Sequence, residues 1–193
     1  GPIHRRMLGI PMDRRDGALD PVIEAALAFC RQQKPHGGIY LHGSVGCGKT
    51  LIASKMIHLL AANRAREINQ SPGWPWADSA TPPDASIVTV PGLLARIRAT
   101  FDHDGESARS VVDDHRLTWF VAFDDIGAEK PTEWVRDTLF QIIDWRYGYN
   151  LPTVFTSNCS LVNLANRLGE RIADRILEMC SGRIIEIKCG SYR

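Results

Sequence analysis

The sequence predicts an α/β fold with a central parallel sheet, and three observations lead to this prediction. Residues 43–50 read Gly-Ser-Val-Gly-Cys-Gly-Lys-Thr, which fits the pattern G-x-x-x-x-G-K-[ST] of a phosphate-binding loop. This segment lies between a short apolar run and an apolar helical pattern, which is the strand–loop–helix context that the loop requires. Strand-like and helix-like segments then alternate along the chain, as is typical of a parallel sheet covered by helices.

The expected elements follow one another in a regular order. The first helix starts at Asp20-Pro21, because Asp is a favoured N-cap and Pro is favoured in the first helical turn. Thr132 is expected to cap a later helix. The expected strands are short β-branched or aromatic runs: 38–42, 87–90, 119–123, 152–156 and 184–187. The expected helices carry apolar residues three or four apart: 22–33, 50–62, one from 91, 107–115, one from 132, 161–167 and 170–179.

Composition limits the classes of protein that fit. The chain has 193 residues, of which 44% are apolar, and a net charge of +1. This length favours one domain, and the near-neutral charge means that any nucleic-acid site must be local. The five cysteines form no C-x-x-C pair and no zinc spacing, which is typical of a reduced cytoplasmic protein. No apolar run approaches membrane-spanning length and no signal peptide is present, so no membrane partner is expected.

The domain organisation is simple. Gly1-Pro2 is typical of the remnant of a cleaved tag, and residues 3–193 are expected to form one domain. The segment 69–86 is rich in Pro, Gly and small polar residues and is predicted to be a long surface loop. Its Trp74 and Trp76 either pack the loop onto the domain or stack on bases or a partner.

The phosphate-binding loop supplies the first candidate site residues. Its glycines let backbone N–H groups point at phosphate oxygens. Lys49 places a positive charge on the β- and γ-phosphates, and the Thr50 hydroxyl suits Mg²⁺. The residues expected to bind the nucleotide are Gly43, Ser44, Val45, Gly46, Cys47, Gly48, Lys49, Thr50 and Leu51. The alternatives are a glycine-rich turn without a ligand and, for Cys47, a redox role instead of a side chain that points away.

An acidic pair follows the apolar run at 119–123, which suits a central strand buried on both faces. Asp124, at the strand tip, has the context of a carboxylate that holds Mg²⁺ beside the phosphate loop. Asp125 is placed to act as the base for an attacking water. Glu129 and Glu133 are alternative bases, although both can be acids of a first helical turn. The remaining alternative is a solvated Asp-Asp turn.

Polar and basic residues further along the chain complete the candidate site. Asn158 follows the next buried strand, and ligands of open α/β sheets bind at the carboxyl ends of strands. Asn158 therefore either orients the lytic water or caps the next helix. Arg171 and Arg175 lie four apart on one helix and share a face, which indicates either anion contact or pairing with the neighbouring acids 170, 174 and 178.

Four sequence blocks carry a specific resemblance. They are Phe123–Thr132 (F-D-D-I-G-A-E-K-P-T), Thr156-Ser157-Asn158, Leu168–Ile176 (L-G-E-R-I-A-D-R-I) and Ser191-Tyr192-Arg193. Together they resemble the AAA+ module of the DnaC/DnaI helicase loaders, and IstB-like transposition helpers are similar throughout. The D-D-I-G and G-E-R-I-x-x-R-I blocks are much more specific than the phosphate loop.

The resemblance implies a fold and a catalytic set. The fold is a P-loop NTPase of AAA+ type, with a parallel sheet in the order 5-1-4-3-2 flanked by helices. Neither a C-terminal lid domain nor an N-terminal partner-binding domain is expected in this chain. The residues implied to act in catalysis are Lys49, Asp124, Asp125, Asn158, Arg175 and Arg171, and those implied to hold Mg²⁺ are Thr50 and Asp124.

The resemblance also implies contacts outside one subunit. Arg175 is expected to reach the ATP of a neighbouring subunit in trans, with Arg171 in support; such arginine fingers raise turnover by roughly 10³–10⁵ in other P-loop systems. The helix from Pro91 matches the place where loaders carry their initiator-type insertion. Arg96 and Arg98 are therefore expected to contact single-stranded DNA, with solvated helix charges as the alternative.

The function expected from these features is ATP-dependent loading of a DnaB-type replicative helicase onto single-stranded DNA, with ATP and Mg²⁺ as cofactors. ATP binding at the subunit interface would set an assembly state, and hydrolysis would release it. The alternatives are an IstB-like transposition helper, a nucleotide-gated DNA-binding scaffold with little turnover, and a small-molecule kinase. The kinase alternative lacks the basic lid that such enzymes usually carry.

Overall fold

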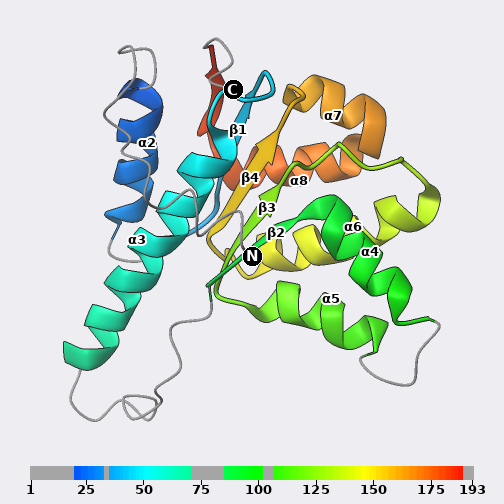
Figure 1. Cartoon of the computed structure of the whole chain (residues 1–193), viewed down its shortest axis with the longest axis horizontal. Helices are drawn as coiled ribbons and strands as arrows, with labels where there is room; N and C mark the ends of the chain where they lie inside the picture. The colour runs from blue at the N-terminus through cyan, green and yellow to red at the C-terminus, as the bar shows by residue number, and fades with distance from the viewer. Residues whose placement is uncertain (1–19, 33–34, 71–84, 102–106, 189–193) are drawn as a thin grey trace.

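The computed structural model describes residues 20–32, 35–70, 85–101 and 107–188 (Figure 1). In this part of the chain, strands and helices alternate as the sequence predicts. The elements are α2 (Asp20–Cys30), β1 (Gly38–Gly43), α3 (Lys49–Gln70), β2 (Ala85–Thr89), α4 (Val90–Ala99), α5 (Ala108–Leu117), β3 (Phe120–Asp124), α6 (Glu133–Gly148), β4 (Thr153–Ser157), α7 (Leu161–Leu168), α8 (Glu170–Cys180) and β5 (Ile184–Ile187).

The five strands form one parallel sheet in the order β2-β3-β4-β1-β5. Read from the other edge, this is the predicted order 5-1-4-3-2, which is therefore confirmed. Because all strands run the same way, their carboxyl ends meet at one edge of the sheet. The loop after β1, the acidic pair at the end of β3 and the polar tip of β4 lie along that edge.

Two apolar clusters make the domain a three-layer structure, with α2 and α3 on one face of the sheet and α4 to α8 on the other (Figure 1). Alternate residues of β3 divide between the clusters: Phe120 and Ala122 face α2 and α3, whereas Val121 and Phe123 face the other helices. This two-sided burial explains why the strand is apolar throughout.

The boundaries of the predicted surface loop 69–86 are wrong at both ends. Helix α3 continues to Gln70, and strand β2 already begins at Ala85. The extra turns of α3 carry Ala, Arg and Glu, which are strong helix formers, although few apolar residues marked them as helical. The rest of this loop, including Trp74 and Trp76, lies outside the described residues. The first helix likewise ends at Cys30, short of the predicted residue 33.

The predicted cap is confirmed, since the Thr132 hydroxyl accepts a hydrogen bond from the main-chain N–H of Val135 at 3.3 Å. This contact fixes the start of α6 just after the acidic pair. Among the described residues, no helix is both long and apolar enough to span a bilayer.

Candidate nucleotide-binding site

The phosphate-binding loop joins β1 to α3, and Lys49 is the first residue of that helix. The Lys49 side chain is buried, and its Nζ donates to the main-chain oxygens of Gly43 at 2.9 Å and Ser44 at 2.8 Å. The ammonium group is thus held inside the loop. A Cβ on Gly43 would lie 2.5 Å from the main-chain oxygen of Ile187 in β5, so glycine is needed where the loop leaves the sheet.

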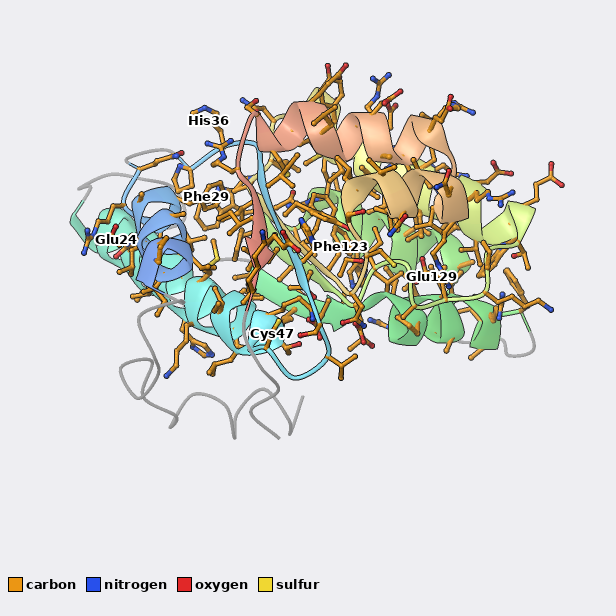
Figure 2. The ribbon with its side chains drawn as sticks, turned by 90° about the horizontal axis from the view of Figure 1, so that it is seen from above. Glu24, Phe29, His36, Cys47, Phe123 and Glu129 are labelled. Atoms are coloured by element: carbon orange, nitrogen blue, oxygen red, sulfur yellow. The ribbon has the colours of Figure 1, made fainter. Side chains whose placement is uncertain are left out.

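Cys47 lies at the same loop, where β1 joins α3 (Figure 2). Its side chain is fully buried and belongs to the cluster formed with α2 and α3. The Lys49 ammonium lies 3.7 Å from its Sγ. Burial of this thiol agrees with a side chain that points away from the phosphate, and supports packing as the role of Cys47.

Asp124 ends β3 and is only 5% exposed. Two hydroxyls from different elements donate to its carboxylate. The Thr50 Oγ1 lies 2.8 Å from Asp124 Oδ1 and 3.1 Å from Oδ2, and the Thr156 Oγ1 of β4 lies 2.6 Å from Oδ1. The structure therefore brings the loop threonine and the strand-tip carboxylate together, as predicted.

This pair is suited to Mg²⁺. Because the Thr50 hydroxyl donates its proton to Asp124, its oxygen lone pairs remain available for a cation. Magnesium prefers oxygen ligands and usually combines one or two protein groups with waters and substrate phosphates. Among the described residues, no three His, Cys, Asp or Glu side chains cluster as a metal site. A cation held jointly by Thr50, Asp124 and a nucleotide fits this arrangement.

Asp125 and Asn158 also meet, although 33 residues separate them. The Asn158 Nδ2 donates to Asp125 Oδ1 at 3.0 Å, and the main-chain N–H of Asp125 donates to Thr156 Oγ1 at 3.0 Å. Asp125 has a φ of 62°, a left-handed conformation that is uncommon outside glycine. A partly exposed carboxylate is therefore held in a fixed orientation beside the buried Asp124.

Glu129 has a structural role that the sequence did not predict. Its side chain is buried, lies on the side of the sheet covered by α6 (Figure 2), and accepts the N–H of Gly127 with Oε1 at 3.2 Å and Oε2 at 3.1 Å. Burial raises the pKa of Glu129. Glu129 precedes the cap of α6 and is not in its first turn, so that part of the prediction is wrong. Glu133 does begin the helix and is exposed.

Arg175 has two carboxylate partners, and one of them, Glu178, is among the neighbouring acids that the sequence offered as the alternative to anion contact. Its Nε donates to Asp144 Oδ1 at 2.7 Å, its Nη1 donates to Glu178 Oε2 at 3.3 Å, and its guanidinium lies 4.7 Å from the centre of the Tyr147 ring. The hydrogen bond to Asp144 raises the pKa of Arg175. Glu178 was a foreseen partner. Asp144 was not, because it comes from α6 and no spacing within one helix reveals it.

Arg171 lies one turn earlier on α8 and contacts the same neighbouring helix. Its guanidinium lies 4.0 Å from the centre of the Phe140 ring. The side chain is exposed. Arg171 and Arg175 therefore share a helix face, as predicted, and both are anchored on aromatic rings of α6.

Arg96 and Arg98 lie on α4 and point to different neighbours. The Arg96 Nη2 lies 4.0 Å from Asp114 Oδ2 of α5. The Arg98 guanidinium lies 4.7 Å from the centre of the Trp134 ring, and Phe101 packs edge-on against Trp134 with ring centroids 6.1 Å apart. Phe101 is 62% exposed, so Arg98, Phe101 and Trp134 form an accessible cationic and aromatic surface that the sequence did not predict.

Most of the contacts that the sequence did not predict join residues far apart in the chain, whereas the hydrogen bond from Gly127 to Glu129 spans only two positions. One of them had a usable signal. Strands β3 and β4 run parallel with Phe123 opposite Phe155, so the next residues, Asp124 and Thr156, lie side by side. A polar residue at the tip of a buried strand therefore indicates a hydrogen-bond partner for the carboxylate of the neighbouring strand. The surface formed by Arg98, Phe101 and Trp134 depends on how α4 packs on α6, which periodicity does not specify.

The sequence is similar to curated replicative helicase loaders. It is 30% identical over 125 residues to the replicative helicase loader DnaI of Bacillus subtilis (strain 168), a match that covers 64% of this chain and 33% of DnaI. It is 27% identical over 90 residues to the replicative helicase loader DnaC of Escherichia coli (strain K12), covering 47% of this chain and 37% of DnaC. The chain thus spans about a third of the length of these relatives. No family model matches the sequence.

Solved structures of proteins named DnaI and DnaC share the fold. A crystal structure of DnaI superposes with a TM-score of 0.72 at 28% identity, over 95% of this chain and 94% of that one. The DnaC helicase loader gives 0.73 at 21% identity, over 95% and 99%. A replication initiator DnaA solved with AMPPCP and single-stranded DNA gives 0.66 at 14% identity, over 95% and 50%. The chain therefore contains an AAA+ module similar to that of the DnaC and DnaI helicase loaders.

Proposed function

We propose that this chain is the ATP-hydrolysing module of a protein that loads a DnaB-type replicative helicase onto single-stranded DNA. The observation that carries the proposal is the polar network at the strand tips, where Thr50, Asp124, Asp125 and Asn158 converge. The network lies in a chain similar to named helicase loaders, and it provides the groups that nucleotide hydrolysis requires.

Each group of the network has a defined task with bound ATP. The Lys49 ammonium exchanges its two main-chain acceptors for phosphate oxygens, while the loop amides and the N-terminus of α3 favour the same anion. Mg²⁺ between Thr50 and Asp124 would neutralise charge on the phosphates. Asp125 accepts a proton from the attacking water, and the Asn158 amide fixes the carboxylate that does so.

Arg175 is proposed to complete the site of a neighbouring subunit. Its known partners occupy Nε and Nη1, and a guanidinium has five N–H donors, so Nη2 can serve a phosphate without breaking the ion pair to Asp144. The ion pairs with Asp144 and Glu178 also hold the flexible Arg175 side chain in one orientation, which favours contact with the ATP of a neighbouring subunit. Turnover would then depend on self-association.

Single-stranded DNA is proposed to bind along α4. Arg98 supplies positive charge, and the exposed Phe101 ring beside Trp134 supplies a platform on which a base can stack. Arg96 is the second candidate for phosphate contact, from the half-exposed position where it lies near Asp114.

Two measurements on the full chain test the ATPase and DNA-binding parts of this proposal, and a loading assay tests the rest. The first is phosphate release with and without single-stranded DNA, for the wild type and for Asp125→Asn. Turnover that DNA stimulates, and that Asp125→Asn abolishes while ATP still binds, supports the ATPase. ATP-dependent DNA binding without turnover in the wild type would instead identify a nucleotide-gated scaffold.

The second measurement is DNA affinity by fluorescence anisotropy at 50 and 200 mM salt. We expect affinity to fall steeply with salt, because phosphate contacts release counterions. We also expect Phe101→Ala to weaken binding more than Leu117→Ala, an equally exposed control on α5.

Loading of a replicative helicase onto a single-stranded circle then separates the loader from a transposition helper. Transfer of phosphate to a small molecule, without a response to DNA, would indicate a kinase.

A further inference from the structure

Thr156 connects the two carboxylates of the acidic pair through one hydroxyl. It lies in β4, beside β3, and is 1% exposed. Its Oγ1 donates to Asp124 Oδ1 at 2.6 Å and accepts the main-chain N–H of Asp125 at 3.0 Å. A hydroxyl can donate one hydrogen bond and accept two, and the Thr156 hydroxyl acts here both as a donor, to Asp124, and as an acceptor, from Asp125.

The two contacts act on different properties of the site. The bond to Asp124 is a hydrogen bond to a carboxylate, a short and strong type, and together with Thr50 it holds the carboxylate from two sides. The bond to the Asp125 main chain lies where φ is 62°, so it stabilises the left-handed turn that presents the second carboxylate. Loss of the hydroxyl frees Asp124 to rotate and loosens the backbone that orients Asp125.

We propose that Thr156 is a positioning residue for the metal and for the catalytic base, and that its hydroxyl sets the affinity of the nucleotide site for Mg²⁺. The inference rests on the proposed nucleotide site. Thr156 does not touch the nucleotide; it acts through Asp124 and Asp125. Removal of such a supporting contact to a metal ligand typically costs about 10- to 100-fold in metal affinity or activity.

The experiment compares Thr156→Val, Thr156→Ser and Thr138→Val. Valine keeps the shape of threonine but removes the hydroxyl, whereas serine keeps the hydroxyl. Thr138 is a buried threonine of α6 and provides a matched control. The readout is the affinity for a fluorescent ATP analogue, titrated with Mg²⁺ and also without it, alongside phosphate release and thermal melting of each variant.

We expect Thr156→Val to raise the Mg²⁺ concentration for half-maximal effect by about 10- to 100-fold, to lower kcat, and to leave nucleotide affinity without Mg²⁺ unchanged. Thr156→Ser should stay close to the wild type, and so should Thr138→Val. If Thr156→Val does not fold, Thr156→Cys replaces it with the same expectation, because a thiol is a weak donor.

Two results would overturn the inference. One is an Mg²⁺ dependence in Thr156→Val that equals that of the wild type. The other is an equal loss of nucleotide affinity with and without Mg²⁺, which would show a purely structural role. These results can be told apart from a failure of the proposed function. If the wild type binds Mg²⁺ and the ATP analogue but does not hydrolyse ATP, the binding measurements still test the role of Thr156. If the wild type binds no nucleotide, both the proposed function and the role of Thr156 are refuted.

Discussion

Replacing Arg146 by lysine should lower the free energy of unfolding more than any other conservative change in α6. Arg146 is 0% exposed, and each of its five N–H groups has an acceptor. The acceptors are four main-chain oxygens and one hydroxyl: Thr153 Oγ1 (2.9 Å), His115 O (3.0 Å), Thr118 O (2.7 Å), Trp119 O (3.3 Å) and Pro152 O (3.0 Å). Burial lowers the pKa of Arg146 to about 9, which still leaves it charged at neutral pH.

The magnitude follows from counting acceptors. A lysine ammonium has three N–H donors, so at least two of the five acceptors lose their partner in Arg146→Lys. Each buried acceptor left without a hydrogen bond costs about 1–3 kcal/mol. Because Pro152 O also accepts the Val121 N–H, one or two acceptors are left unsatisfied, which gives about 1–6 kcal/mol in total. That is a large part of the roughly 5–15 kcal/mol by which a domain is stable.

The assay is urea unfolding followed by circular dichroism, with Arg136→Lys as the matched control. Arg136 is an exposed arginine of the same helix that donates one hydrogen bond, to the main chain of Arg167. The control should stay within about 0.5 kcal/mol of the wild type, and both variants should keep the wild-type slope. An Arg146→Lys variant as stable as the control would show that the five acceptors do not depend on the guanidinium.

Three further predictions concern the stability of the domain. Gly127→Ala should cost about 1–3 kcal/mol, because φ is 89° and a Cβ would lie 2.8 Å from Leu164 Cδ1; urea unfolding that shows no loss would contradict this. Burial lowers the pKa of His115 below its usual 6.5. The neutral imidazole therefore makes its whole contribution to the free energy of unfolding above pH 6.5, and this contribution is lost as the pH falls, because His115 binds a proton more readily in the unfolded chain. The melting temperature of His115→Asn should therefore rise relative to the wild type between pH 7 and 5, and a constant difference would disprove it. Burial raises the pKa of Glu129 above 4.5, so the protonated carboxyl makes its whole contribution to the free energy of unfolding below that pH and loses it as the pH rises. The melting temperature of Glu129→Gln should therefore rise relative to the wild type above pH 4.5. A constant difference between the two melting temperatures across this range would count against the prediction.

Much of the fold follows from local pattern and chain connectivity. The β3 run is apolar throughout because both faces are covered, and Thr132 caps α6 through a bond three residues away. The pairing of Thr50 with Asp124 could also be predicted, since a phosphate loop requires a carboxylate at the neighbouring strand tip. Such features depend on residues close in sequence or on a parallel sheet whose strand tips share one edge.

Other features depend on how helices pack, which no local pattern specifies. Asp144 is 31 residues from Arg175 and pairs with it only because α6 lies against α8. No local pattern marks Arg146 as buried, yet its main-chain acceptors lie in the segments that lead into β3 and β4. The end of α3 was misplaced because its last turns are polar and carry helix propensity without an apolar face.

Each ATP site is proposed to take Asp125 from one subunit and Arg175 from its neighbour. Phosphate release from Asp125→Asn, from Arg175→Ala and from an equimolar mixture of the two tests this arrangement. Each variant alone should be nearly inactive. Random assembly through a head-to-tail interface should restore about a quarter of the wild-type rate in the mixture, because some sites then combine an intact Asp125 with an intact Arg175. A mixture no faster than the mean of the two variants would show that Arg175 does not act across the subunit interface.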